Sequence, residues 1–226
     1  MLPPCSRTMP PEADAIRPRS LADPEQLAVR RAPRNAAHVA PLQALARRIA
    51  AERSAAVPDP DPHDGGIGAR LLLLLETPGP GIGRTGIVSR DNPTGTAANL
   101  FRFMAEAGIA RRDSLIWNAV PWVIHAPGAL NRAPRKAEIA SAAVYLAPLI
   151  DLVPSLAVVV LAGRVAGLSR EPLSRLRPGI PVLAFPHPSP TFVCTSPLVA
   201  QRIVEGLAQA AATLLSYRTS PAEGPR

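Results

Sequence analysis

Five consecutive leucines, Leu71–Leu75, restrict the fold of this chain more than any other feature of its sequence. A continuous apolar run of this length is typical of a strand covered on both faces, as in a parallel sheet between two layers of helices. Three more short apolar runs have the same character, at 114–120, 157–161 and 180–185. Each run is followed by a loop or a helical pattern. This alternation predicts an α/β fold, a three-layer α/β/α sandwich with a four-stranded parallel sheet.

The helices of this sandwich are predicted from apolar residues that recur at helical spacing. Such patterns cover 35–53, 134–150, 164–170 and 196–217. Asn92 and Pro93 predict one more helix, with asparagine as its N-cap and proline in its first turn, which stops at Gly108.

Composition divides the chain into one domain and two tails. Residues 1–34 are rich in proline, arginine and acidic residues and have no steady period, which predicts a poorly ordered tail. Residues 35–217 hold every strand and helix pattern and suit one domain, because 226 residues with 47% hydrophobic content would make two domains cramped. Residues 218–226 are predicted to form a C-terminal tail.

The formal charge of +8 and the pI of about 11.0 favour a polyanionic partner, because each phosphate that a protein neutralises releases a counterion. Basicity is weak evidence by itself, since heavy use of arginine, alanine and proline also reflects genomic composition bias. Two cysteines, Cys5 and Cys194, exclude a disulfide scaffold, and the four histidines lack metal-ligand spacing. No apolar run approaches the roughly 20 residues that cross a bilayer. We expect a soluble cytoplasmic monomer without metal or cofactor.

Polar residues follow three of the four predicted strands, at the point where each strand ends. Glu76 follows the first, Asn118 the second and His187 the fourth. Ligands of parallel α/β sheets bind beyond the carboxyl ends of the strands. A carboxylate, an amide and an imidazole are therefore expected to converge on one crevice.

Each of these side chains has a functional and a structural interpretation. Glu76 could orient water or stabilise a cation, or it could cap a backbone amide or pair with an arginine. His187 lies between prolines that fix its main chain, so its ring could donate a hydrogen bond to a leaving base, although most loop histidines have no such role. Asn118 offers the donor and acceptor that reading a pyrimidine edge requires, or it is a turn asparagine that caps its own backbone.

A match to the dinucleotide-binding fingerprint, Gly-x-Gly-x-x-Gly, occurs at 81–86. That motif must open a helix directly, and residues 87–91 show no helical pattern. Pro78 and Pro80 also disturb the tight turn that it needs. A nicotinamide-binding enzyme is therefore a minor alternative. Lys136, the only lysine, lies in a stretch typical of a solvated helix start, which favours attack by water over a Schiff base.

The order of these motifs resembles that of family 4 uracil-DNA glycosylases over about residues 71–215. Leu-Glu-Thr-Pro-Gly at 75–79 resembles that family's first motif, Gly-Glu-Ala-Pro-Gly. Ile-Trp-Asn-Ala-Val at 116–120, with Asn-Arg-Ala-Pro at 131–134 and Glu138, is similar to its second segment. Leu-Ala-Gly-Arg-Val-Ala at 161–166 looks like its approach to the next strand, and His-Pro-Ser-Pro at 187–190 matches its His-Pro-Ser motif.

The resemblance implies a pocket that takes a base flipped out of DNA. Glu76 would place or activate water, Asn118 would read the uracil edge and His187 would stabilise the leaving uracil anion. Other base-pocket and DNA contacts implied by the matching positions, or expected beside them, are Thr77, Pro78 and Gly79, then Arg164, and then the wedge residues Pro188, Ser189, Pro190, Thr191 and Phe192. Base extrusion costs a few kcal/mol of unstacking, which such a loop offsets.

The sequence departs from the family pattern at three points. Family 4 proteins hold an iron–sulfur cluster on four cysteines, so two cysteines predict no cluster here. Thr77 stands where other families place Asp or Asn, and it cannot act as a base in the same way. The phenylalanine that stacks on uracil has no match, because Asn92 or Pro93 occupies its place. A looser pocket that also accepts hypoxanthine or xanthine is expected.

The sequence thus predicts a monofunctional uracil-DNA glycosylase of base excision repair, with single- or double-stranded DNA as its partner. A non-catalytic DNA-binding relic of the same fold is the main alternative. Such a relic would bind DNA with salt-sensitive affinity and leave every base intact.

Overall fold

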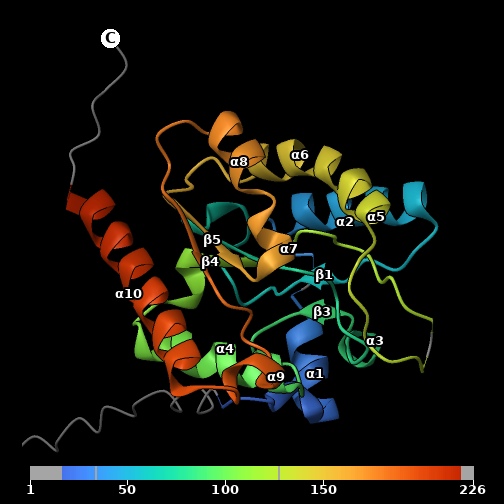
Figure 1. The fold of residues 1–226 in the computed structure, drawn as a ribbon. Coiled ribbons are helices and arrows are strands. Elements are labelled where there is room, and N and C mark those ends of the chain that lie inside the picture. The colour runs from blue at the N-terminus through green and yellow to red at the C-terminus, as the bar shows by residue number, and fades with distance from the viewer. Residues whose placement is uncertain (1–16, 34, 127, 220–226) are drawn as a thin grey trace, which may run out of the picture.

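The structure is a computed structural model that describes residues 17–33, 35–126 and 128–219 (Figure 1). Its centre is a sheet of four parallel strands in the order β4-β2-β5-β6. These strands are β2 (Leu71–Leu75), β4 (Ser114–Asn118), β5 (Val158–Ala162) and β6 (Val182–Phe185). Helices cover both faces of the sheet, so the predicted α/β/α sandwich with four parallel strands is confirmed.

The leucine run forms β2, one of the two central strands. Its side chains alternate between the faces, as the pleat of a strand requires. Leu72 and Leu74 pack into one hydrophobic cluster, and Leu71 and Leu73 pack into the other. Both faces of β2 are covered, which fits its lack of polar side chains. The first polar side chain after the strand is that of Glu76, at the carboxyl edge of the sheet.

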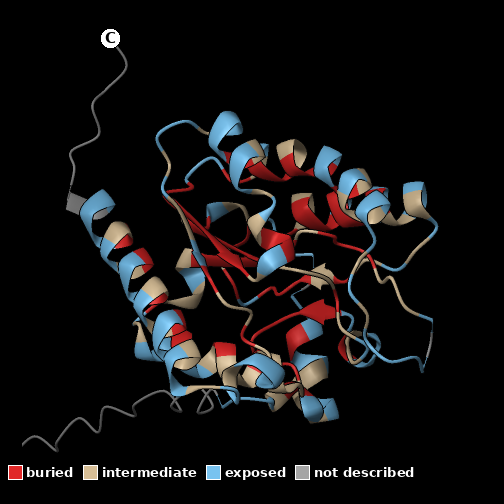
Figure 2. Cartoon of the chain, viewed as in Figure 1, coloured by how far each residue is buried: buried red, intermediate tan, exposed pale blue. Residues whose placement is uncertain are grey.

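Two sets of helices make the outer layers, and Figure 2 shows the buried residues gathered in the strands and on the inward sides of these helices. One face is covered by α2 (Ala40–Arg53), α5 (Lys136–Ala142), α6 (Leu146–Asp151) and α8 (Arg170–Leu176). The other face is covered by α4 (Gly95–Glu106) and α10 (Pro197–Thr219).

Shorter elements connect the layers. A second, two-stranded parallel sheet pairs β1 (Asp59–Pro60) with β3 (Ile87–Val88). The remaining helices are α1 (Pro24–Arg31), α3 (Ile82–Thr85), α7 (Arg164–Gly167) and α9 (Pro190–Val193), with single 3-10 turns at Ser20–Ala22, Gly66–Gly68, Arg111–Asp113 and Ala143–Tyr145. Among the residues described, no helix has both the length and the apolar character that crossing a membrane requires.

The predicted tail over residues 1–34 is wrong for its second half, although residues 1–16 and 34 lie outside the described residues. Helix α1 is capped by Asp23, whose side chain accepts a hydrogen bond from the Glu25 amide. Arg30 is buried, and its guanidinium binds Asp61 at 2.7 Å and Asp91 at 2.6 Å. These ion pairs join α1 to two loops of the domain. At the other end, α10 extends to Thr219, past the predicted limit at 217.

Several helix limits differ from those predicted. The helix expected from Asn92 begins at Gly95, and Thr94 is its N-cap, with its hydroxyl accepting from the Ala97 amide. The Asn92 side chain instead donates from Nδ2 to the Ile87 carbonyl at 2.8 Å. The single helix expected over 134–150 is α5, a 3-10 turn and α6, and that expected over 164–170 is α7 followed by α8.

Candidate active site

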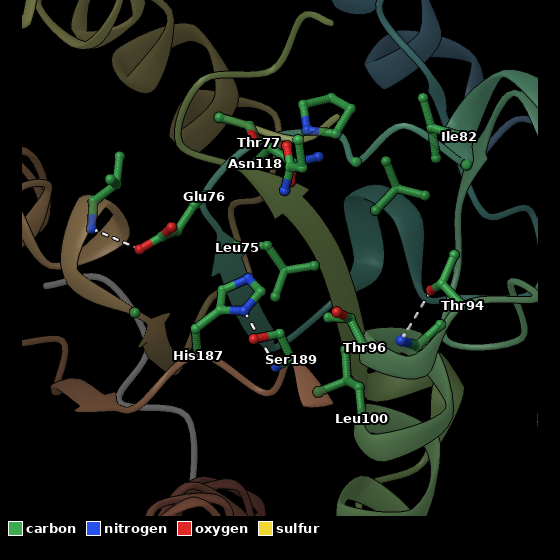
Figure 3. Close-up of a pocket in the computed structure, with 18 of the residues that line it drawn as sticks. Leu75, Glu76, Thr77, Ile82, Thr94, Thr96, Leu100, Asn118, His187 and Ser189 are labelled. Carbon is green, nitrogen blue, oxygen red and sulfur yellow. Dashed lines mark hydrogen bonds between the residues drawn. The ribbon is translucent and has the colours of Figure 1, made fainter. Parts of the chain in front are cut away.

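A pocket of about 890 Å³ opens at the carboxyl edge of the sheet. It lies where the sequence predicted a crevice, beyond the ends of β2, β4 and β6. Figure 3 shows Glu76, Asn118 and His187 arriving from three separate segments around Leu75. The structure therefore brings together the carboxylate, the amide and the imidazole that follow these strands. Most of the other predicted site residues also line the pocket: Thr77, Pro78, Gly79, Arg164, Ser189, Thr191 and Phe192.

Glu76 is held against the start of α7. Its Oε1 accepts a hydrogen bond from the Val165 amide at 2.9 Å, so one of its oxygens caps a helix, as the structural interpretation of this residue predicted. A Cβ atom built on Gly163 would lie 2.5 Å from Glu76 Oε1 and 3.1 Å from His187 Cβ. Gly163, with φ of +100°, therefore separates the two side chains and lets both approach the main chain.

His187 is half-buried, and its ring accepts a main-chain hydrogen bond. The Ser189 amide donates to Nδ1 at 3.2 Å. In the neutral ring this contact places the proton on Nε2. Burial lowers the pKa of His187 from its ordinary value of 6.5, and the nearby Glu76 carboxylate opposes that change. The ring is therefore neutral at pH 7, with Nε2–H as a hydrogen-bond donor.

Asn118 ends β4 with its side chain buried at the pocket wall. Among the described residues no hydrogen bond to its side-chain amide is present, so both its donor and its acceptor are free for a ligand. Its main chain is fixed by pairing with Leu75, since β2 and β4 are in register at their ends. Thr77 lies two residues past β2 and lines the same pocket.

The segment after β6 carries the wedge residues and turns into α9. Phe192 is 54% exposed at the pocket mouth, and Thr191 is also exposed. Pro188 is buried and Pro190 contacts α4, and neither of them lines the pocket. These two prolines therefore contact the protein outside the pocket, whereas Ser189, Thr191 and Phe192 line the pocket itself.

Two arginines line the pocket. Arg164 is exposed at the start of α7, and Arg132 lies beside Asn131, which also lines the pocket. Arg132 binds Glu138 through both of its terminal nitrogens, at 2.9 and 2.5 Å, and donates to the Ile124 carbonyl. Its hydrogen bonds hold the pKa of Glu138 at about 2. This pair fixes the loop that carries Asn131 against α5.

Sequence reasoning did not identify Gly163, Asn131 or Arg132 as site residues. A glycine directly after a buried strand is a signal for close approach of the backbone to another group, and it could have drawn attention to Gly163. Asn131 and Arg132 lie in a motif that was recognised, but their role depends on how the loop folds back over the sheet. That contact is made between distant parts of the chain and leaves no local pattern.

The fingerprint at 81–86 does not form a dinucleotide site. Residues 82–85 make a single helical turn, Gly86 has φ of +66°, and the chain then enters β3. A phosphate-binding helix does not follow, as the absence of a helical pattern at 87–91 predicted. Among the described residues, no group of three or more His, Cys, Asp or Glu side chains could hold a metal ion.

A family model of the uracil DNA glycosylase superfamily matches residues 62–208. The match includes all four strands of the main sheet and every segment that lines the pocket. No curated protein matches the chain. Since the matched region covers well over half of its length, the chain belongs to the uracil-DNA glycosylase superfamily.

Proposed function

We propose that this protein is a monofunctional glycosylase that hydrolyses the N-glycosidic bond of uracil flipped out of DNA. The observation that carries the proposal is the convergence of Glu76, Asn118 and His187 on one pocket at the carboxyl edge of the sheet. Superfamily membership supports DNA glycosylase chemistry in general. The exposed Arg164 at the pocket and the net charge of +8 suit a DNA partner.

His187 would act on the leaving base. When the C1′–N1 bond breaks, its electron pair passes to the uracil ring and negative charge develops on the carbonyl oxygen beside N1. A neutral imidazole with Nε2–H can donate to that oxygen, as a donor placed for developing charge does in an oxyanion hole. Because Ser189 binds Nδ1, the donor nitrogen is fixed before the substrate arrives.

Glu76 would act on the sugar side. Its Oε1 is bound to the Val165 amide, and its second oxygen carries no hydrogen bond among the described residues. That oxygen can accept a hydrogen bond from water, which attacks C1′ and leaves a hydroxyl group there while its proton passes to the carboxylate or to solvent. The charge of the carboxylate also stabilises the oxocarbenium-like sugar.

Asn118 would recognise the flipped base. The loop after β6 would fill the gap that the flipped base leaves in the DNA stack. The free amide and carbonyl of Asn118 can meet the N3–H and a carbonyl oxygen of uracil. Phe192, exposed at the mouth, would wedge into the base stack with Ser189 and Thr191 beside it. Arg164 would contact a phosphate.

Attack by water rather than by an amine is supported by the position of Lys136. This only lysine begins α5, is exposed and does not line the pocket. A Schiff-base lyase needs an amine within reach of C1′. The product is therefore an intact strand with an abasic site.

The test is incubation of the protein with end-labelled DNA that contains one uracil, single- and double-stranded, followed by alkali. Cleavage only after alkali supports a monofunctional glycosylase. Cleavage without alkali contradicts it in favour of a lyase. Uncut strands in every substrate, with salt-sensitive binding retained, would identify the non-catalytic DNA binder instead.

Hypoxanthine and xanthine form a second substrate class. A volume of about 890 Å³ exceeds what one pyrimidine fills. In addition, Asn92 or Pro93 stands where the family pattern has the phenylalanine that stacks on uracil. The same assay with a panel of deaminated bases separates the two cases. Excision of uracil alone would contradict the broader range.

A further inference from the structure

The segment that carries His187 has few main-chain donors with which to hold itself in place. Three of the five residues in 186–190 are prolines, which have no N–H. The N–H of Ser189 is used on the His187 ring. Proline also fixes the local dihedral angles, so residues 186–190 form a rigid segment. Its orientation depends on contacts with other parts of the protein.

Helix α4 supplies two such contacts. The Asn99 side chain donates from Nδ2 to the Pro188 carbonyl at 3.0 Å, between the histidine and the wedge. A Cβ atom on Gly95 would lie 2.3 Å from Pro190 Cγ, so the proline ring packs directly on the first turn of the helix. The two contacts lie one helical turn apart and hold the 186–190 segment on both sides of Ser189.

The orientation of the Asn99 amide is itself defined. Arg102 Nη2 donates to Asn99 Oδ1 at 3.4 Å, which leaves Nδ2 as the group that faces Pro188. Asn99 does not line the pocket and so does not touch the base. Its effect on the reaction must therefore be transmitted through the 186–190 segment.

We propose that Asn99 is a positioning residue for His187, holding the Pro188 carbonyl so that the imidazole keeps its place in the pocket. The proposal rests on the function proposed above for His187. In this proposal, an amide of α4 that lies outside the pocket controls the orientation of the His187 ring, which donates a hydrogen bond to the leaving base.

The first test compares Asn99→Ala, Asn99→Asp and Asn99→Gln in single-turnover excision of uracil from DNA. Asn99→Ala removes the donor and Asn99→Asp replaces it with an acceptor, so both are expected to lower the rate by about tenfold or more. Asn99→Gln keeps the donor and should recover part of the rate. The higher helix propensity of alanine offsets much of the lost hydrogen bond to Pro188, so the melting temperature of Asn99→Ala should change little. Gln209→Ala, an exposed amide on α10, is the matched control.

A double-mutant cycle with His187→Ala shows whether Asn99 acts through the histidine. In that background Asn99→Ala should change the rate by less than about twofold, because the group that it positions is gone. A full tenfold loss in both backgrounds would overturn the proposal, as would an unchanged rate in Asn99→Ala.

A second readout does not need catalysis. The ring signals of His187, followed by NMR against pH, should titrate at a higher pH in Asn99→Ala than in the parent protein, because a released ring is less desolvated. An unchanged titration would overturn the positioning role. A shifted titration in a protein that excises no base would keep that role and contradict the proposed function, so the two failures are distinguishable.

Discussion

Gly163 is the residue on which the two proposed catalytic side chains depend most directly. It lies between Glu76 and His187 and has φ of +100°. It directly follows β5, the strand that lies between β2 and β6 in the sheet. A side chain there would meet Glu76 Oε1 at 2.5 Å in a conformation that residues other than glycine rarely adopt. Space and backbone angle thus exclude a Cβ atom for independent reasons.

Gly163→Ala is expected to lower the excision rate by about a hundredfold, since displacement of a catalytic group by about 1 Å can have that effect. The backbone strain should also reduce the free energy of unfolding by about 1–3 kcal/mol. Single-turnover kinetics and urea denaturation measure the two effects. Gly167→Ala in α7, where an added Cβ meets nothing within 4 Å, is the control: it should leave the excision rate unchanged and should not lower the free energy of unfolding.

The pH dependence of excision should report the neutral form of His187. Burial lowers the pKa of this residue below 6.5, so the ring stays neutral as the pH falls through that value. If the Nε2–H of a neutral ring stabilises the leaving base, the rate should decline with falling pH, with the midpoint of that decline below pH 6.5. A rate that rises as the pH falls from 7 to 6 would instead identify the imidazolium as the active form.

At the scale of elements, the sequence predicted what depends on local pattern. The leucine run gave the limits of β2 correctly, because a strand buried on both faces has no polar residue inside it. The predicted start of α4 was wrong by a few residues, because Thr94 rather than Asn92 caps the helix. Strands β1 and β3 were missed, since two residues cannot show a period.

Thr94 is therefore the residue whose loss should weaken α4. Thr94→Ala is expected to reduce the free energy of unfolding by about 1 kcal/mol, because the Ala97 amide loses its cap. Since Thr94 also lines the pocket, excision should slow as well. Thr94→Ser should restore the stability. Equal denaturation midpoints for Thr94→Ala and the parent protein would rule out the capping role, and Thr213→Ala on α10 serves as the control.

At the scale of the whole molecule, a buried network of ion pairs connects α1 to the domain. It consists of three arginines and three aspartates, Arg30, Arg90, Arg111, Asp61, Asp64 and Asp91. Such a network could not be predicted from the sequence, because its members are far apart along the chain and only the fold pairs them. The same is true of the contact between Asn99 and Pro188. Glu76, Asn118 and His187 line one pocket, as predicted, because the carboxyl ends of parallel strands lie at the same edge of a sheet.

Asp64 should make stability depend on pH. Burial raises its pKa from 3.8 to about 7, so the folded state binds a proton more tightly than the unfolded state. This contribution to stability is complete below about pH 4 and is lost as the pH rises through 7. The free energy of unfolding of the parent protein, measured relative to Asp64→Asn, should therefore fall between pH 4 and 7. Parallel stability curves for the two proteins would contradict the raised pKa.

The position of Arg30 has a consequence for where this protein can be cut. The family match begins at residue 62, yet buried Asp91 takes one of its two arginine partners from a helix that ends at Arg31. A version trimmed to the matched region would lose Arg30 and leave the buried carboxylate of Asp91 with Arg111 alone. The segment that relatives have in common is thus smaller than the unit that folds, and α1 belongs to the folding unit.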